Sequence, residues 1–240
     1  MIETYYSGAF WGVRQESPEE CGRRAEVFFT QLAPVDPSFS RWLKQGRSRK
    51  EAFKHNIETD QHTLTKLFRR GKDKIFDDLG FRISGWNGES ADMDASAFYI
   101  ACGGYSEVVH NQCSFDLPST GPNAERILTA PVLTGLVRAM AVAWEPDWAI
   151  ATSSDHRELV SKTGEIGTFV GWVMYLSRRR GTVPPLPAPV HIERVEDKGT
   201  LIVLTPERFT VSNPDHVTLA GRVHELLDRA KLLGPVALNP

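Results

Sequence analysis

The sequence changes its pattern at Phe81, and no other feature restricts the fold as strongly. Before Phe81, helix-start signals recur: Ser17, Pro18 and Glu20 form a capping box ahead of apolar residues spaced by three or four. From Phe81 on, short runs rich in apolar and aromatic residues alternate with Gly, Asn, Ser and Asp, as in the strands of a meander. This grouping predicts an α+β fold, with mixed or antiparallel sheets covered by helices.

The same local signals predict the individual elements. Strands are expected over 2–13, 81–86, 97–103, 111–117, 147–152, 167–177, 191–195 and 200–205. Helices are expected over 17–32, 36–46, 59–70, 123–144, 155–164 and 213–230, and one more starts at Ser48. Pro131 should either kink the helix over 123–144 or mark its true start.

The order of these elements bears on the domain organisation. A strand, helices, three strands and a helix are followed by a strand, a short helix, three strands and a helix. A diverged duplication with halves 1–145 and 146–240 would produce this order, although the residues themselves do not repeat. The length of 240 residues fits one large domain or two small ones.

Charge is segregated along the chain. The net charge is only −2, so no global field indicates a nucleic acid or an anionic membrane as partner. Residues 41–74 hold eleven basic and four acidic side chains, which predicts a basic helical layer and leaves a nucleic-acid-binding module as an alternative. Residues 81–176 carry a balance of −6.

Cysteine usage and apolar runs indicate the compartment. Three cysteines, Cys21, Cys102 and Cys113, cannot form a closed disulfide framework, which favours a reducing environment. The first residues show no secretory leader, and the most apolar stretch, 127–144, contains an arginine and a proline and fits a buried helix better than a membrane span. We therefore expect a cytoplasmic protein without membrane contact.

Most catalytic and metal-binding patterns fail when they are tested. His224 and Glu225 resemble the start of a zinc-peptidase motif, but Asp228 stands where the second histidine is needed. Cys102, His110 and Cys113 match no zinc-site spacing, and a fourth ligand is not evident. We expect no cofactor and no metal ion.

One catalytic alternative stays open. Asp147, Glu196 and Lys198 resemble the residues with which restriction-type nucleases hold Mg²⁺ and assist the attacking water. The two parts lie far apart in the sequence, and Glu196-Asp197-Lys198-Gly199 is also typical of a charged hairpin turn.

The acidic middle of the chain is the candidate binding surface. Carboxylates and large aromatic residues occur together in segments that should be loops, and such loops suit a cationic protein partner, with the carboxylates steering association and a tryptophan as anchor. The candidate interface residues are Trp86, Glu89, Asp92, Asp94, Trp148 and Asp155. The alternative is that the partner binds at the basic segment, in which case Arg47, Arg49 or Lys50 would matter.

Longer stretches of the chain resemble a known family. YYSGAFWGVRQESPEECGRRAEVFF (5–29), FSRWLKQGRSRKEAFKHN (39–56) and FRISGWNG (81–88) are similar to the immunity protein 52 family, and TLIVLTPERF (200–209) fits it more loosely. The resemblance implies a single domain over 1–240 that acts in the bacterial cytoplasm. It also implies binding to a cognate type VI secretion toxin with a restriction-endonuclease-like nuclease domain, with no catalysis by the chain itself.

Overall fold

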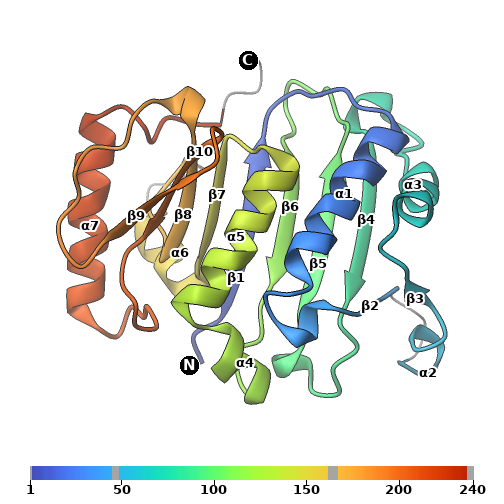
Figure 1. Ribbon diagram of the computed structural model, residues 1–240, viewed down its shortest axis with the longest axis horizontal. Coiled ribbons are helices and arrows are strands. Elements are labelled where there is room, and N and C mark those ends of the chain that lie inside the picture. The colour runs from blue at the N-terminus through green and yellow to red at the C-terminus, as the bar shows by residue number, and fades with distance from the viewer. Residues whose placement is uncertain (1, 45–48, 162–166, 237–240) are drawn as a thin grey trace.

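The computed structural model describes residues 2–44, 49–161 and 167–236 (Figure 1). A ten-stranded sheet runs through it in the order β3-β2-β4-β5-β6-β1-β7-β8-β10-β9, and the paired strands are antiparallel. The strands are β1 (Tyr5–Trp11), β2 (Trp42–Leu43), β3 (Asn56–Ile57), β4 (Phe81–Trp86), β5 (Ala97–Cys102), β6 (Asn111–Asp116), β7 (Trp148–Ser153), β8 (Val173–Ser177), β9 (His191–Val195) and β10 (Gly199–Val203). The predicted α+β class is confirmed, with an antiparallel sheet.

Two central helices, α1 and α5, cover one face of this sheet, and the other helices lie around them and on the opposite face. The α-helices are α1 (Pro18–Leu32), α2 (Arg49–Ala52), α3 (Gln61–Arg70), α4 (Pro122–Ile127), α5 (Ala130–Trp144), α6 (Ser154–Val160) and α7 (Pro214–Arg229). Single turns of 3-10 helix occur at Pro37–Phe39, Asp77–Leu79, Asp92–Asp94 and Arg178–Arg180. Helices α1 and α5 lie side by side across the sheet, and α3 packs against α1 (Figure 1).

Local sequence signals account for the start of both central helices. The Ser17 hydroxyl accepts a hydrogen bond from the Glu20 amide, and the Glu20 carboxylate accepts one from the Ser17 amide, which completes the predicted capping box. Pro131 lies in the first turn of α5, so the stretch 123–144 is two helices and the proline marks the true start of the second.

The central strand β1 shows how the sheet meets the helices. Its odd-numbered residues face α5, because Trp11 stacks on Trp144 with ring centroids 5.4 Å apart, and the Ser7 hydroxyl lies 3.6 Å from Met140 Sδ. The same Ser7 hydroxyl donates to the Ile150 carbonyl oxygen at 2.9 Å, so a buried polar group is satisfied between two strands.

The opposite face of the sheet is unevenly covered. Over β7, Trp148 packs against Phe169, and Phe169 packs against His156 of α6. Over β4, β5 and β6, most of the side chains that alternate with the core residues are exposed or half-buried. These open-face residues are Arg82, Ser84, Tyr99, Gln112, Ser114 and Asp116.

Part of the predicted layout is wrong. The helix expected over 36–46 is a single 3-10 turn followed by β2, and Gly46 lies outside the described residues. Trp42 decides this, because its ring is buried against Phe98 and Phe115, and that burial outweighs the local helix-start signal at Asp36. The basic segment 41–74 is therefore not a continuous helical layer.

The second half of the chain also differs from the predicted layout in one strand. The strand expected over 167–177 begins only at Val173. The halves 1–145 and 146–240 share one sheet, since β1 pairs with β7, and their strands follow different orders. An ancestral duplication stays a prediction.

Candidate functional site

The acidic segment after β4 contains the first three predicted interface residues. Trp86 ends β4 and is half-buried, with its ring edge-on to Phe53 at 6.2 Å between centroids. Glu89 is half-buried and Asp92 is exposed, both in the connection from β4 to β5. The tryptophan is thus partly covered by a neighbouring side chain, while the carboxylates lie nearer to the solvent.

Asp94 is used inside the structure. Its side chain is buried, and Oδ1 accepts hydrogen bonds from the amides of Asn123 and Ala124 at 2.9 and 3.2 Å. These amides belong to the first turn of α4, where a carboxylate compensates donors that lack intrahelical partners. The geometry gives Asp94 a structural task at the start of α4.

Trp148 and Asp155 lie at the two ends of β7. Trp148 is only 6% exposed and stacks on Phe10 with centroids 5.3 Å apart. Asp155 is half-buried in the first turn of α6, which is capped by the Ser153 hydroxyl. Of these two residues, Asp155 is the one that reaches the surface.

The sheet topology brings part of the predicted set to one edge. Strands β4, β6 and β7 are separated from one another by even numbers of antiparallel steps, so they point the same way and end at the same edge. This is the lower edge in Figure 1. We call it the acidic edge, and it carries Glu89, Asp92, Asp116 and Asp155.

Arg126 lies among the acidic groups near this edge. Hydrogen bonds from the guanidinium to Asp36, together with the charges of Asp36, Asp94 and Glu89, raise the pKa of Arg126. The positive charge of Arg126 therefore cancels part of the negative potential that the carboxylates of the acidic edge present to a partner.

A basic cleft lies at the opposite edge of the sheet. It has a volume of about 710 Å³ and lies where β1 and β8 end and β7 begins. Seven of its lining residues are cationic: Arg14, Arg24, Arg178, Arg179, Arg180, Lys198 and Lys231.

The cleft also contains two of the three residues of the nuclease alternative. Asp147 Oδ2 accepts a hydrogen bond from Arg180 Nη2 at 2.6 Å, and Lys198 Nζ lies 2.9 Å from a Glu145 oxygen and 3.5 Å from a Glu196 oxygen. The Lys198 bond lowers the pKa of Glu145, and the Glu145 bond in turn raises the pKa of Lys198. Within the described part of the chain, no three His, Cys, Asp or Glu residues are grouped as a metal ion requires.

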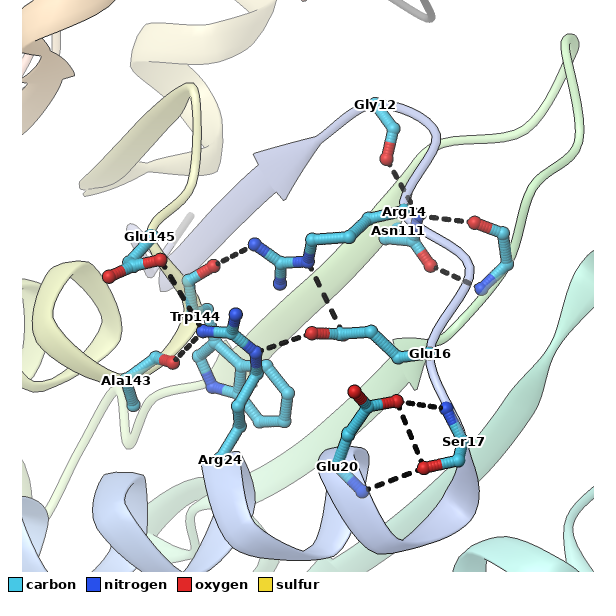
Figure 2. Close-up of polar contacts among 11 residues, drawn as sticks. Gly12, Arg14, Glu16, Ser17, Glu20, Arg24, Asn111, Ala143, Trp144 and Glu145 are labelled. Carbon is cyan, nitrogen blue, oxygen red and sulfur yellow. Dashed lines mark hydrogen bonds and ion pairs between the residues drawn. The ribbon is translucent and has the colours of Figure 1, made fainter.

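Two of the arginines that line the cleft bind the end of α5 (Figure 2). Arg14 Nη1 donates to the Trp144 carbonyl oxygen at 2.7 Å, and Arg24 Nη1 donates to that of Ala143 at 3.0 Å. Glu16 joins them, with Oε1 2.5 Å from Arg24 and Oε2 3.3 Å from Arg14. The pair thus satisfies carbonyl groups at a helix C-terminus, where positive charge is favourable.

Burial of the Arg14 guanidinium lowers its pKa, and the neighbouring Glu16 only partly offsets this effect. No local signal could have revealed the caps, since Arg14 and Trp144 lie 130 positions apart.

The basic segment is partly neutralised by α1. Arg69 of α3 forms an ion pair with Glu19, and the Gln61 amide donates to Glu26 Oε1 at 3.0 Å. Lys50 is exposed on α2, whereas Arg47 lies outside the described residues. Because Arg69 pairs with Glu19, it is less available to bind the phosphate groups of a nucleic acid.

The three cysteines form no disulfide in the structure. Cys21, Cys102 and Cys113 are free and buried, and burial raises the pKa of the Cys113 thiol well above its usual range. His110 contacts the Val236 carbonyl oxygen through Nε2 at 3.1 Å. Across residues 2–44, 49–161 and 167–236, no helix has the length and apolar character to cross a bilayer.

Comparison with known proteins places the chain in a family. The fold is similar to that of the Pseudomonas aeruginosa T6SS protein PA0821, with a TM-score of 0.54 and 13% identity over 93% of this chain and 76% of that one. No curated protein matches the chain in sequence. The model of the family Imm52, immunity protein 52, matches residues 3–236, and the chain therefore belongs to the immunity protein 52 family.

Proposed function

We propose that the chain neutralises a cognate toxin by stoichiometric binding in the bacterial cytoplasm, and that this toxin is a type VI secretion effector with a restriction-endonuclease-like nuclease domain. The family match over residues 3–236 is the observation that carries the proposal. The similarity in fold to a protein described as belonging to a type VI secretion system supports the choice of toxin class.

Charge supports a nuclease as the target. A nuclease surface that tracks DNA is cationic, and an inhibitor that approaches it gains association rate from negative charge. Residues 81–176 have a balance of −6, and Glu89, Asp92 and Asp155 share one edge of the sheet. We assign the steering role to these three carboxylates, with Trp86 beside them. Asp94 supports the same edge from inside, whereas Trp148 begins β7 and therefore lies at the opposite edge of the sheet.

The surroundings of Asp147 and Lys198, two residues of the nuclease alternative, support a binding role without catalysis. Asp147 accepts a hydrogen bond from Arg180 and Lys198 donates one to Glu145, so both side chains have partners within the chain. In the proposal, the chain inhibits by occupying a surface of the toxin.

The test uses the cognate toxin that the proposal requires. The purified toxin nuclease domain is titrated with the chain in a DNA-cleavage assay, and calorimetry gives the stoichiometry. We expect cleavage to stop at an integer ratio of the two proteins. Cleavage that continues at saturating chain, or Mg²⁺-dependent DNA cleavage by the chain alone, would refute the proposal.

A further inference from the structure

Two loops at the upper edge of the sheet in Figure 1 expose large apolar side chains. One loop joins α3 to β4 and the other joins β5 to β6, so they meet at adjacent strand ends. We call them the apolar loop pair. Its exposed residues are Ile75 (82%), Phe76 (58%), Tyr105 (38%), Val108 (81%) and Val109 (49%).

The two loops lie side by side because their backbones are hydrogen-bonded to each other. The amides of Tyr105 and Ser106 both donate to the Asp78 carbonyl oxygen, at 2.8 and 3.1 Å. Within the first loop, the Asp73 amide donates to the Gly80 carbonyl oxygen at 3.1 Å. These bonds hold both tips beside the start of β4.

Asp73 fixes the backbone that carries Ile75 and Phe76. Its Oδ1 accepts hydrogen bonds from the Ile75 and Phe76 amides at 2.9 and 2.8 Å, and its Oδ2 lies 3.0 Å from Arg82 Nη2. These backbone bonds, first that of Phe76, lower the pKa of Asp73. Polar groups thus order a turn whose apolar side chains remain in water, and such preorganisation reduces the entropy cost of binding a partner.

We propose that the apolar loop pair is the anchor on which the cognate toxin docks. This inference rests on the proposed function, because membership of an immunity family supplies the protein partner. Contiguous exposed apolar residues surrounded by polar ones are typical of interaction sites, and a few central aromatic and aliphatic residues carry most of the binding energy at an interface.

The charged residues around the loop pair fit a protein better than a lipid surface. Lys72 and Asp77 form an exposed ion pair at 2.9 Å, and the other rim charges are those of Lys74, Asp78 and Glu107. The acidic groups outnumber the basic ones, whereas an anionic bilayer attracts clusters of lysine and arginine. A protein with complementary charges can pair with a rim of mixed sign.

One toxin can reach both this anchor and the acidic edge. Strands β4 and β5 run from one to the other, and six residues of strand span roughly 20 Å. The open face of β4, β5 and β6 lies between the two ends. A standard interface of about 800 Å² on each partner is wide enough to cover that distance.

The test replaces the exposed anchors and leaves the turn intact. The double variant Phe76→Ser, Val108→Ser and the single variant Ile192→Ser are compared with the parent chain by surface plasmon resonance against the toxin nuclease domain. Ile192 is 37% exposed on β9, so it serves as a matched apolar control at the far end of the sheet. We expect the double variant to bind roughly 100-fold more weakly, mainly through faster dissociation, and the control to bind like the parent.

The outcomes separate this inference from the proposed function. If the parent chain binds the toxin and the double variant binds equally well, the apolar loop pair is not the anchor. If the double variant changes only the self-association of the chain in analytical ultracentrifugation, the surface belongs to a second copy and the inference is wrong. Failure of the parent itself to bind the toxin contradicts the proposed function instead. Unchanged thermal unfolding of the double variant shows that any loss of binding is local.

Discussion

Arg126 donates two hydrogen bonds to Asp36, from Nε to Oδ2 at 2.5 Å and from Nη2 to Oδ1 at 2.9 Å, although the two residues lie 90 positions apart. The Asp36 side chain is only 2% exposed. Burial raises the pKa of Asp36, but the bonds from Arg126 and Ser38 outweigh it, so the net result is a pKa below the ordinary value of 3.8. The ionised form is thus the one that the fold stabilises.

Replacement of Asp36 by asparagine should make the protein less stable and less sensitive to acid. We expect a loss of about 1–3 kcal/mol in the free energy of unfolding at pH 7, since Arg126 would lose its charged partner. In the parent, this contribution is complete above the unfolded-state pKa near 3.8 and disappears as the pH falls through the lower folded-state pKa. Urea unfolding of parent and variant between pH 7 and pH 2 measures both effects.

The matched control is Asp77→Asn, because Asp77 pairs with Lys72 in a solvent-exposed position. Its effect on the free energy of unfolding should be much smaller than that of Asp36→Asn, because water screens an exposed ion pair. An Asp36→Asn variant as stable as this control at pH 7 would contradict the assignment.

Charge reversal at the acidic edge should slow binding of the toxin. In the double variant Glu89→Lys, Asp92→Lys, we expect association roughly tenfold slower at low salt, with a difference that shrinks as the ionic strength rises. Stopped-flow association with the toxin nuclease domain measures this. Glu225→Lys with Asp228→Lys places the same charge change on α7 and should have little effect; equal slowing by both doubles would remove the acidic edge from the mechanism.

Loss of the Asp94 carboxylate should reduce stability. We expect Asp94→Ala to lower the free energy of unfolding by about 1–2 kcal/mol, because two amides at the start of α4 lose their acceptor. Chemical denaturation of this variant and of Asp228→Ala, an exposed change on α7, makes the comparison. Asp94→Ala should still bind the toxin once folded, and a variant that is fully stable yet fails to bind would give Asp94 a direct role.

Asp147 and Glu196 should differ in their effects if neither is catalytic. Asp147→Ala leaves Arg180, whose side chain is 8% exposed, without its carboxylate, so we expect a loss of about 3 kcal/mol or more. Glu196→Ala removes an exposed pair with Lys198 and should cost less than about 1 kcal/mol. Thermal unfolding and a Mg²⁺-dependent DNA-cleavage assay are run on both variants and on the parent chain. DNA cleavage by the parent that either substitution abolishes would favour the nuclease alternative.

The elements that could be predicted from the sequence are those whose signals are local. The start of α1 depends on Ser17 and Glu20, three residues apart, and the start of α5 depends on Pro131. Strand β2 has no such signal, because Trp42 is held by aromatic rings from β5 and β6. A contact formed by residues distant in sequence cannot be recognised from neighbouring letters.

The same limit applies to the candidate surface. Trp148 stands between acidic residues in the sequence, as an exposed anchor would, but Phe10 and Phe169 enclose its ring. Conversely, Ile75 and Val108 belong to short apolar runs that read as ordinary loop or strand residues, and only the sheet register shows that their loops meet. The composition of the sequence therefore shows where the acidic residues gather. Which side chains are exposed can be read only from the folded structure.

The position of β1 has a consequence for synthesis on the ribosome. The first strand of the chain lies between β6 and β7, with Tyr5 opposite Ser153, so one of its flanks has no partner until more than half of the polypeptide has been translated. Nascent chains stopped before β7 would leave an unsatisfied row of amides and carbonyls, which chaperones or sibling chains can capture. The complete sheet, and any toxin binding that depends on it, can therefore form only after β7 has been translated.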